Sequence, residues 1–397
     1  MTTSTLLRAA PALADPFTRL RQGYAQARRA GARRHRDIAD LLGASEGELI
    51  AAHVAAHIAA PVTAPDAAQS APDTDQPGGL QATRLQGPWP ELVAALESVG
   101  EVMALSRNVS CVHEKIGTYR DASANGPAGR EMGLVLGPDI DLRVFYSRWV
   151  HGLAVVEAGE RGVQRSMQFF DAQGTAVHKV FARASTDLSA WAALVARFAS
   201  PDTVPGMDVL PAPAALPSEK PDAEVDLAAF HEGWTALRDT HEFFGLLRRH
   251  GLSRTQALRL AEPRFVQPVE ADSAQALLHG AAAAGTPVMV FVGNPGVIQI
   301  HTGPVHRVQV MGPWLNVLDP GFNLHLREDH IASAWVVRKP TSDGLVTSLE
   351  LFDARGETIA MFFGERKPGR PELCAWRTLV EGLAGEGRGT EASPCSC

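Results

Sequence analysis

The stretches Gln168-Phe-Phe-Asp-Ala-Gln-Gly174 and Glu350-Leu-Phe-Asp-Ala-Arg-Gly356 repeat one pattern within a single chain of 397 residues. Their shared Phe-Asp-Ala-x-Gly cores lie 182 positions apart. Upstream, Gly137-Pro-Asp-Ile-Asp-Leu-Arg143 and Asp319-Pro-Gly-Phe-Asn-Leu-His325 are separated by the same 182 positions. Because two pairs share one spacing, the chain is predicted to contain two copies of one structural unit.

The sequence around the second anchor has short apolar runs separated by turn residues, which is typical of antiparallel strands. The predicted strands cover residues 288–292, 297–301, 306–310, 315–318, 322–326, 334–338, 346–352 and 358–363. Asp-Ala-Gln-Gly and Asp-Ala-Arg-Gly predict hairpin turns whose glycine takes a positive φ. Runs of strands closed by a helix, without regular strand–helix alternation, predict an α+β fold. We therefore expect two tandem structural repeats, each a large antiparallel β-sheet with flanking helices.

Proline-rich sequence separates the two copies. Six prolines occur between Pro201 and Pro221, so we predict an N-terminal repeat over residues 1–212 and a C-terminal repeat over residues 222–397. Within the first repeat, residues 61–87 are rich in Pro, Ala, Asp, Gln and Thr, a composition typical of a flexible loop. Cys395 and Cys397 end the chain as a Cys-x-Cys tail, which by itself is half of a soft-metal site.

Composition excludes several classes of protein. A net charge of -7 argues against a nucleic-acid partner, which would require a basic surface. Since no run of about 18 apolar residues occurs, the chain is not expected to be membrane-embedded. Four cysteines do not predict a disulfide framework. Arg8 and Pro11 interrupt the apolar stretch near the start, so a secretory signal is not indicated. We predict a cytoplasmic location.

A segment before the second copy carries one histidine among apolar residues at helical spacing. The series with intervals of three and four is Leu227, Phe230, Trp234, Leu237, His241 and Phe244. It predicts one helical stripe that stops at Gly251, with His241 facing apolar material. Two interpretations follow. His241 is either a core histidine satisfied by its neighbours, or a neutral imidazole on an aromatic wall that can serve as an axial ligand to a porphyrin.

The predicted strand 140–145 places Asp141, Arg143 and Phe145 on one face. A face that combines arginine with phenylalanine suits an apolar ligand with charged edges, and the alternative is an exposed sheet face. A similar face is formed by Ile359, Met361 and Phe363, with Arg366 close behind; Lys339 and Arg254 lie at element ends, where cations can reach acidic groups.

Six runs resemble a known family. They are Leu96-Glu-Ser-Val-Gly100, Val112-His-Glu-Lys115, Phe291-Val-Gly-Asn294, Gly312-Pro-Trp-Leu-Asn316, Ala334-Trp-Val-Val-Arg-Lys-Pro-Thr-Ser-Asp-Gly344 and Val346-Thr-Ser-Leu-Glu-Leu-Phe352. From about Arg36 to about Leu383 the chain resembles the haemin-degrading factor, or haemin transport protein, family of HemS, ChuS, PhuS and HmuS type. The resemblance implies a b-type haem, as ligand or substrate, in a cleft of the C-terminal half.

The resemblance also implies roles for individual residues. His241, within Asp239-Thr-His-Glu-Phe-Phe244, falls on the axial ligand of the haem iron, and Arg143 falls on the distal arginine, where it would be the catalytic residue of a degrading enzyme. The residues implied to pack on the macrocycle are Phe145, Phe291 and Phe363, and those implied to contact propionates or the distal side are Arg254, Lys339 and Arg366.

The implied function is that of a cytoplasmic haem-binding protein for iron acquisition, which receives haem from an inner-membrane importer and sequesters, delivers or degrades it. Two interpretations stay open. One is a haem oxygenase-like enzyme with an external reductant, supplied from solution or by a reductase because no flavin or nicotinamide motif is visible. The other is a non-enzymatic carrier that passes intact haem to a separate haem oxygenase.

Overall fold

The computed structural model describes residues 15–54, 79–127, 129–159, 162–212, 219–366 and 369–385. These residues form two compact units. Unit 1 comprises the described residues within Met1–Leu92, Arg148–Ala182 and Asp187–Ala212, and unit 2 those within Val93–Ser147, Arg183–Thr186 and Pro213–Cys397. Within the described ranges, no helix has both the length and the apolar character needed to cross a membrane. The Cys-x-Cys tail lies outside the described residues, as do residues 61–78 of the predicted loop.

Unit 1 contains a four-stranded antiparallel array with helices. Its strands are β1 (Leu80–Leu85), β7 (His151–Gly159), β8 (Gly162–Phe170) and β9 (Ala176–Ala182), in the order β1-β7-β8-β9. Its helices are α1 (Pro16–Arg29), α2 (His35–Leu42), α3 (Glu46–Ala51) and α5 (Leu188–Phe198), and α4 (Trp89–Ala95) begins in it. The prediction of a flexible loop through residue 87 is wrong over residues 80–85, because this segment pairs with β7 along its whole length.

Unit 2 contains a complete nine-stranded antiparallel sheet in the order β10-β16-β17-β18-β11-β12-β6-β5-β4. Its strands are β4 (Ala122–Asn125), β5 (Met132–Leu136), β6 (Asp141–Phe145), β10 (Val266–Val269), β11 (Val288–Asn294), β12 (Val297–Gly303), β16 (Ser333–Thr341), β17 (Gly344–Phe352) and β18 (Thr358–Gly364). A further antiparallel array runs β2-β3-β15-β14-β13, formed by β2 (Val102–Arg107), β3 (Cys111–Gly117), β13 (Val308–Met311), β14 (Trp314–Asp319) and β15 (Phe322–Arg327). Every strand predicted in the second copy is therefore confirmed.

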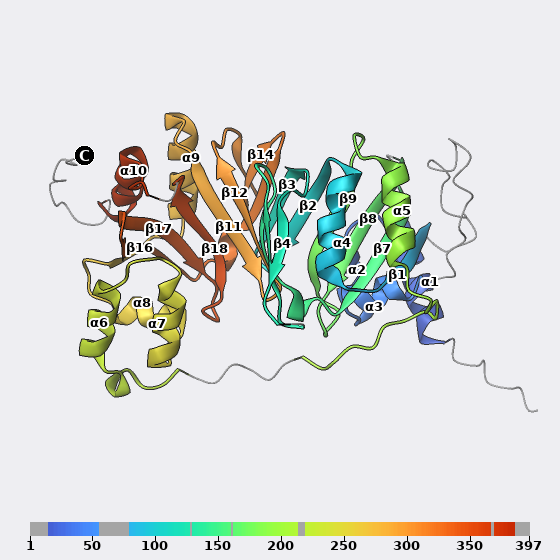
Figure 1. The fold of residues 1–397 in the computed structure, drawn as a ribbon, viewed down its shortest axis with the longest axis horizontal. Helices are drawn as coiled ribbons and strands as arrows, with labels where there is room; N and C mark the ends of the chain where they lie inside the picture. The colour runs from blue at the N-terminus through green and yellow to red at the C-terminus, as the bar shows by residue number, and fades with distance from the viewer. Residues whose placement is uncertain are drawn as a thin grey trace, which may run out of the picture. The chain divides into compact units, whose positions relative to one another are not determined.

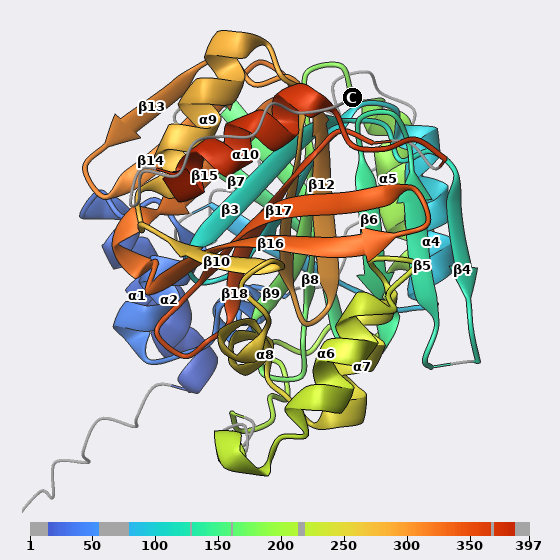
Figure 2. The same cartoon turned by 90° about the vertical axis from the view of Figure 1, so that its left-hand side faces the viewer.

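Helices cover both faces of the nine-stranded sheet at its β10–β18 end (Figures 1 and 2). On one face, α9 (Ser273–Ala284) and α10 (Cys374–Gly385) bury Leu277 and Trp376 in a core with the strands. On the other, α6 (Leu227–Thr235), α7 (Glu242–His250) and α8 (Arg254–Leu260) form a second core around Phe230 and Trp234, joined by Val337 of β16. We call α6–α8 the three-helix cap.

The repeat itself is confirmed. Strands β7 and β16, and strands β8 and β17, begin and end 182 positions apart. Both copies carry a register shift at the same place, between Phe169 and Phe170 in β8 and between Leu351 and Phe352 in β17. The predicted hairpin glycines both have positive φ, 72° at residue 174 and 79° at residue 356.

The copies exchange strands with each other. Strand β6 of the first copy pairs with β12 of the second, with Val144 opposite Val297, and β15 of the second copy pairs with β3 of the first, with Phe322 opposite Lys115. Because of this exchange, the compact units do not follow the repeat boundaries expected at 1–212 and 222–397. Residues 93–147 belong to the first copy but group with unit 2.

The single helical stripe predicted across residues 227–244 is wrong, because α6 ends at Thr235 and α7 begins at Glu242. Carboxylates in the intervening loop satisfy backbone N–H groups that a continuous helix would have used. Glu242 accepts hydrogen bonds from the backbone N–H groups of Arg238 at 2.9 Å and Asp239 at 3.4 Å, and Asp239 accepts from that of His241 at 2.8 Å. Such side chains favour a new helix start over helix continuation.

Candidate functional site

His241 lies at the N-cap position of α7, and its side chain is 91% exposed. The interpretation as a core histidine is therefore wrong. Its Nδ1 lies 2.6 Å from a carboxylate oxygen of Asp239, which fixes the orientation of the ring. Among the described residues nothing hydrogen-bonds its Nε2. An imidazole whose one nitrogen is held by a carboxylate, with the other nitrogen open, is the usual arrangement of a histidine that ligates a metal.

The loop that carries His241 is fixed to the hairpin turn between β16 and β17. The backbone N–H of Ser342, in the turn between β16 and β17, donates to the carbonyl of Arg238 at 2.9 Å. The hydrogen bond from the His241 N–H is the largest cause of a lowered pKa at Asp239, and the charge of Arg366, just beyond β18, lowers this pKa further. Arg366 therefore lies within electrostatic reach of the carboxylate that orients His241.

A strip of half-buried side chains crosses the sheet face that the three-helix cap partly covers. Phe291 of β11 and Phe363 of β18 contact each other with ring centroids 5.0 Å apart, and Phe291 is paired with Met361. On the neighbouring strand, Ile298 of β12 is paired with Arg143 of β6. Since directly opposed residues point to the same side of a sheet, these side chains share one face. We call this set, Phe291, Ile298, Met361, Phe363 and Arg143, the open strip.

Arg143 lies on the β6 face where the strand pattern predicted it, together with Asp141 and Phe145. Its side chain is 30% exposed and forms an ion pair with Asp141. Burial raises the pKa of Asp141, and the guanidinium of Arg143 opposes this shift. The face is thus half-buried rather than fully exposed, and its cation is balanced by a carboxylate of the same strand.

Lys339 and Arg254 are placed differently from the other candidates. The side chain of Lys339 is 3% exposed, and its ammonium donates to Glu350 at 2.7 Å. Burial lowers the pKa of Lys339 to about 8. Arg254 binds the same carboxylate through two nitrogens, at 2.7 and 2.9 Å. Glu350 is fully buried. Lys339 therefore has a partner inside the protein, and Arg254, which is 25% exposed, is the only one of the two cations with appreciable exposure.

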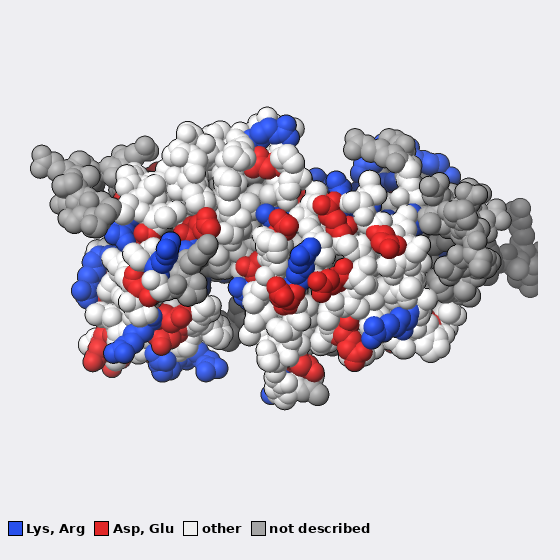
Figure 3. Space-filling view, turned by 45° about the horizontal axis from the view of Figure 1, so that its top comes forward, with Lys and Arg blue, Asp and Glu red and all other residues white. Residues whose placement is uncertain are grey.

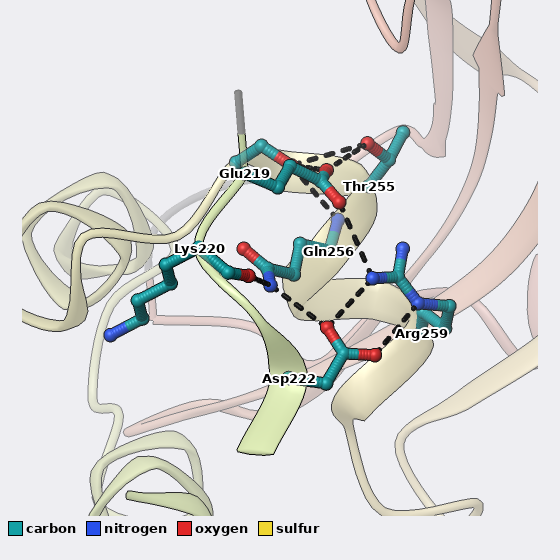
Figure 4. A network of polar contacts seen from close by, with 7 residues as sticks. Glu219, Lys220, Asp222, Thr255, Gln256 and Arg259 are labelled. Carbon is teal, nitrogen blue, oxygen red and sulfur yellow. Dashed lines mark hydrogen bonds and ion pairs between the residues drawn. The ribbon is translucent and has the colours of Figure 1, made fainter. Parts of the chain in front are cut away.

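A polar network holds the cap to the chain that leads into it (Figure 4). Asp222 accepts hydrogen bonds from Gln256 at 2.9 Å and from Arg259 at 2.8 Å, both on α8. Gln256 also donates to the carbonyl of Lys220 at 2.7 Å, and Arg259 forms an ion pair with Glu219 at 3.3 Å. Residues 219–222 are thereby fixed against α8 before α6 begins.

Charges of both signs are mixed on one face of the molecule. On the face drawn in Figure 3, Lys and Arg side chains alternate with Asp and Glu across the described residues and form no extended basic patch. Nor do the residues placed in the structure include a cluster of three or more His, Cys, Asp or Glu side chains able to hold a metal ion. The exposed imidazole of His241, on a helix that covers the same sheet face as the open strip, instead suits a metal that brings its own equatorial ligands.

Comparison with known proteins decides the family. Residues 71–198 and 251–383 both match the haemin-degrading HemS/ChuX domain. The chain belongs to the HemS/ChuX family. Two matches at corresponding positions agree with the duplication seen in the strands. The hemin transport protein HmuS of Yersinia pestis is 41% identical over 351 residues, which cover 88% of this chain and 92% of HmuS.

Solved structures of HemS/ChuX proteins are similar over nearly the whole chain. Holo-PhuS, a heme-binding protein from Pseudomonas aeruginosa, is 44% identical with a TM-score of 0.83, covering 93% of this chain and 99% of PhuS. The heme-degrading enzyme ChuS from Escherichia coli is 37% identical with a TM-score of 0.79, covering 92% of this chain and 99% of ChuS. These relatives thus include one protein described by binding and one described by degradation.

Sequence reasoning assigned no role to two residues of this HemS/ChuX chain. Asp239 received no role beyond its place in the motif around His241. An Asp two residues before a candidate ligand histidine is nevertheless a recognisable signal for an orienting carboxylate. Glu350 was seen only as part of a strand. Its position between Leu349 and Leu351, both fully buried, marks it as an acidic residue in an apolar strand, where a buried charge requires a cationic partner.

Proposed function

We propose that this protein binds one haem, with Nε2 of His241 as the axial ligand of the iron. The observation that carries this proposal is the exposed imidazole, whose Nδ1 is held by Asp239 at 2.6 Å. A carboxylate on Nδ1 makes Nε2 a stronger donor and fixes its direction. The description of PhuS as a heme-binding protein, at 44% identity, supports the same ligand.

The open strip and Arg366 fit a flat, apolar ligand with anionic edges. The macrocycle would pack on Phe291, Ile298, Met361 and Phe363, which are apolar and only half-buried in the ligand-free protein. Arg366, close to Asp239, would pair with a propionate, because guanidinium binds carboxylates well. Phe145 shares the β6 face of Arg143 and would contact the ligand edge. Lys339 is left out of this set because its ammonium is buried against Glu350.

The role that fits such a site is haem handling during iron acquisition. Haem in water aggregates, so an apolar site with one imidazole ligand and cationic edges would keep it monomeric. We propose that the protein works in the cytoplasm, receives haem from an inner-membrane importer and passes it on. The direct test is a haemin titration followed at the Soret band. One haem per chain with a histidine-ligated spectrum is expected, and several equivalent sites or no spectral change would contradict the proposal.

Replacing Asp239 with asparagine should weaken haem binding while leaving the ligand atom in place. The variant loses the charge on Nδ1, so His241 becomes a poorer donor and its ring is held less firmly. We expect haemin affinity to fall by about 10-fold to 100-fold, the usual cost of removing an orienting carboxylate. Competition with apomyoglobin measures this change. Equal affinities for the variant and the wild type would show that Asp239 has no such role.

A second candidate function is haem cleavage. It is favoured by Arg143, whose guanidinium lies on the open strip, and by the description of ChuS as a heme oxygenase. Bound haem would supply the iron chemistry with dioxygen, and electrons would come from an external reductant. Arg143 has no lone pair to ligate iron, but it can donate hydrogen bonds and stabilise negative charge that develops near it. In a carrier the same guanidinium would only help to hold the ligand.

Arg143→Ala separates the two functions. If the protein is an enzyme, ascorbate, air and catalase should bleach the Soret band of the wild-type complex and release iron. Arg143→Ala should then slow bleaching by about tenfold or more, a typical loss for one charge-stabilising group, with a smaller change in haemin affinity. If wild-type haem stays intact and is transferred to a haem oxygenase instead, the protein is a carrier.

A further inference from the structure

We propose that Glu350 is a positioning residue that holds α7, and with it His241, against the sheet. This inference rests on the proposed function, since it concerns how the haem ligand is kept in place. His241 itself makes few contacts, because its side chain is almost fully exposed. Its position therefore depends on the helix that begins directly after it.

Glu350 is the centre of a buried ion cluster. It accepts two hydrogen bonds from Arg254 at 2.7 and 2.9 Å, one from Lys339 at 2.7 Å and one from Ser348 at 3.1 Å. Arg254 is the first residue of α8, whereas Lys339, Ser348 and Glu350 belong to β16 and β17. The cluster therefore joins the three-helix cap to the sheet through charge-assisted hydrogen bonds, which are stronger than neutral ones.

The same cations hold α7. The ammonium of Lys339 lies 4.7 Å from the ring centroid of Phe243, and the guanidinium of Arg254 lies 5.2 Å from it. Phe243 is buried and follows His241 by two residues. Since cations attract the faces of aromatic rings, both partners of Glu350 also hold the first turn of α7. Loss of Glu350 would leave two cations without their carboxylate and would disturb the surface on which Phe243 rests.

The first repeat carries an equivalent anchor with different chemistry. The two helical segments lie 208 positions apart. This spacing follows from the left-handed glycine and the capping serine that each copy carries, Gly43 and Ser45 in the first and Gly251 and Ser253 in the second. At this spacing Glu46 of α3 corresponds to Arg254 of α8. Glu46 also binds the sheet, through an ion pair of 2.5 Å with Lys179 of β9. The polarity of the ion pair is reversed, and the pair reaches β9, the counterpart of β18, whereas Arg254 reaches β17.

The contact between Phe243 and Lys339 also has a counterpart in the first repeat. His35 of α2 lies 208 positions before Phe243, and Glu157 of β7 lies 182 positions before Lys339. His35 Nε2 lies 3.0 Å from a carboxylate oxygen of Glu157, so the same pair of positions is joined in both copies. The residue that corresponds to His241 is Arg33. The anchor is therefore common to both copies, whereas the ligand histidine occurs only in the second.

Two variants and one matched control test this role. Glu350→Gln keeps the shape of the side chain and removes its charge. Phe243→Leu keeps the ion cluster intact and removes the ring above it. Glu46→Gln removes the carboxylate of the Glu46–Lys179 ion pair in the first repeat. For each variant, hydrogen exchange of the α7 amides is measured in the haem-free protein, and haemin affinity is measured by competition with apomyoglobin.

Faster exchange of the α7 amides is expected in both Glu350→Gln and Phe243→Leu. If α7 is then correctly placed about one tenth of the time, haemin affinity falls about tenfold, because apparent affinity scales with the competent fraction. Glu46→Gln should change neither quantity. Unchanged α7 exchange and affinity in folded Glu350→Gln would overturn the proposal, as would an equal loss in Glu46→Gln. If Glu350→Gln does not fold, Phe243→Leu decides. A wild type that fails to bind haemin refutes the proposed function, while the exchange measurement still tests the anchor.

Discussion

Replacing His241 with alanine is expected to abolish the histidine-ligated haemin spectrum and to leave the fold unchanged. The imidazole is 91% exposed, so its removal creates no cavity and leaves no buried polar group without a partner. At the same time, haem loses the only axial nitrogen that the proposed site offers. Haemin should then associate only through the open strip, with affinity reduced by at least about tenfold, or ~1.4 kcal/mol. Absorption spectra and thermal unfolding measure the two effects separately.

His306→Ala is a suitable control, because His306 is also an exposed histidine of unit 2 but lies just before β13. It should behave as the wild type in both measurements. A histidine-ligated spectrum that persists in folded His241→Ala would contradict the assignment and would require another histidine as ligand.

The second repeat alone, residues 219–397, is expected to form a dimer. In the full chain β12 pairs with β6 and β15 pairs with β3, and the fragment lacks both partners. Two unpaired strand edges are exposed as a result, which favours association. Strand β15 is the counterpart of β6, and β12 is the counterpart of β3. Strand β15 of one fragment can therefore pair with β12 of a second fragment, and the reciprocal pairing of β12 with β15 closes the dimer.

Light scattering coupled to size-exclusion chromatography should therefore give about twice the mass of the fragment at micromolar concentration. The full chain is the control, since its β12 and β15 already have partners within the molecule. A fragment that remains monomeric and keeps its native strand content would show that the exchanged edges do not require pairing.

The strands were predictable because their pattern is local. Alternation along β6 placed Arg143 and Phe145 on one face, and the structure agrees. The break between α6 and α7 was not predictable from spacing, because the intervals of three and four continue through it. What ends the helical pattern is the capping by Asp239 and Glu242, and each of these residues is also compatible with a helix interior or its first turn.

Placement of the charged candidates could not be predicted for a different reason. Lys339 and Arg366 both lie near strand ends. Nothing in the neighbouring sequence shows that the ammonium of Lys339 is buried against Glu350, or that Arg366 lies close to Asp239. The strand exchange is equally invisible, since the pairing of β6 with β12 joins residues about 150 positions apart and leaves no periodic signal in either strand.

The exchange of strands also bears on how the chain is made. While a ribosome synthesises the first repeat, the edge of β6 that faces away from β5 has no partner until Val297 and its neighbours emerge about 150 residues later. The edge of β3 that faces away from β2 lacks its partner longer still, until Phe322 emerges. At roughly 5–20 residues per second, this interval is on the order of ten seconds. During that time the two unpaired strand edges of one nascent chain can pair with those of other nascent chains on the same messenger RNA. Translation by many ribosomes on one messenger RNA should therefore favour misassembled chains. A chaperone that covers the edges of β3 and β6 should raise the yield of native protein.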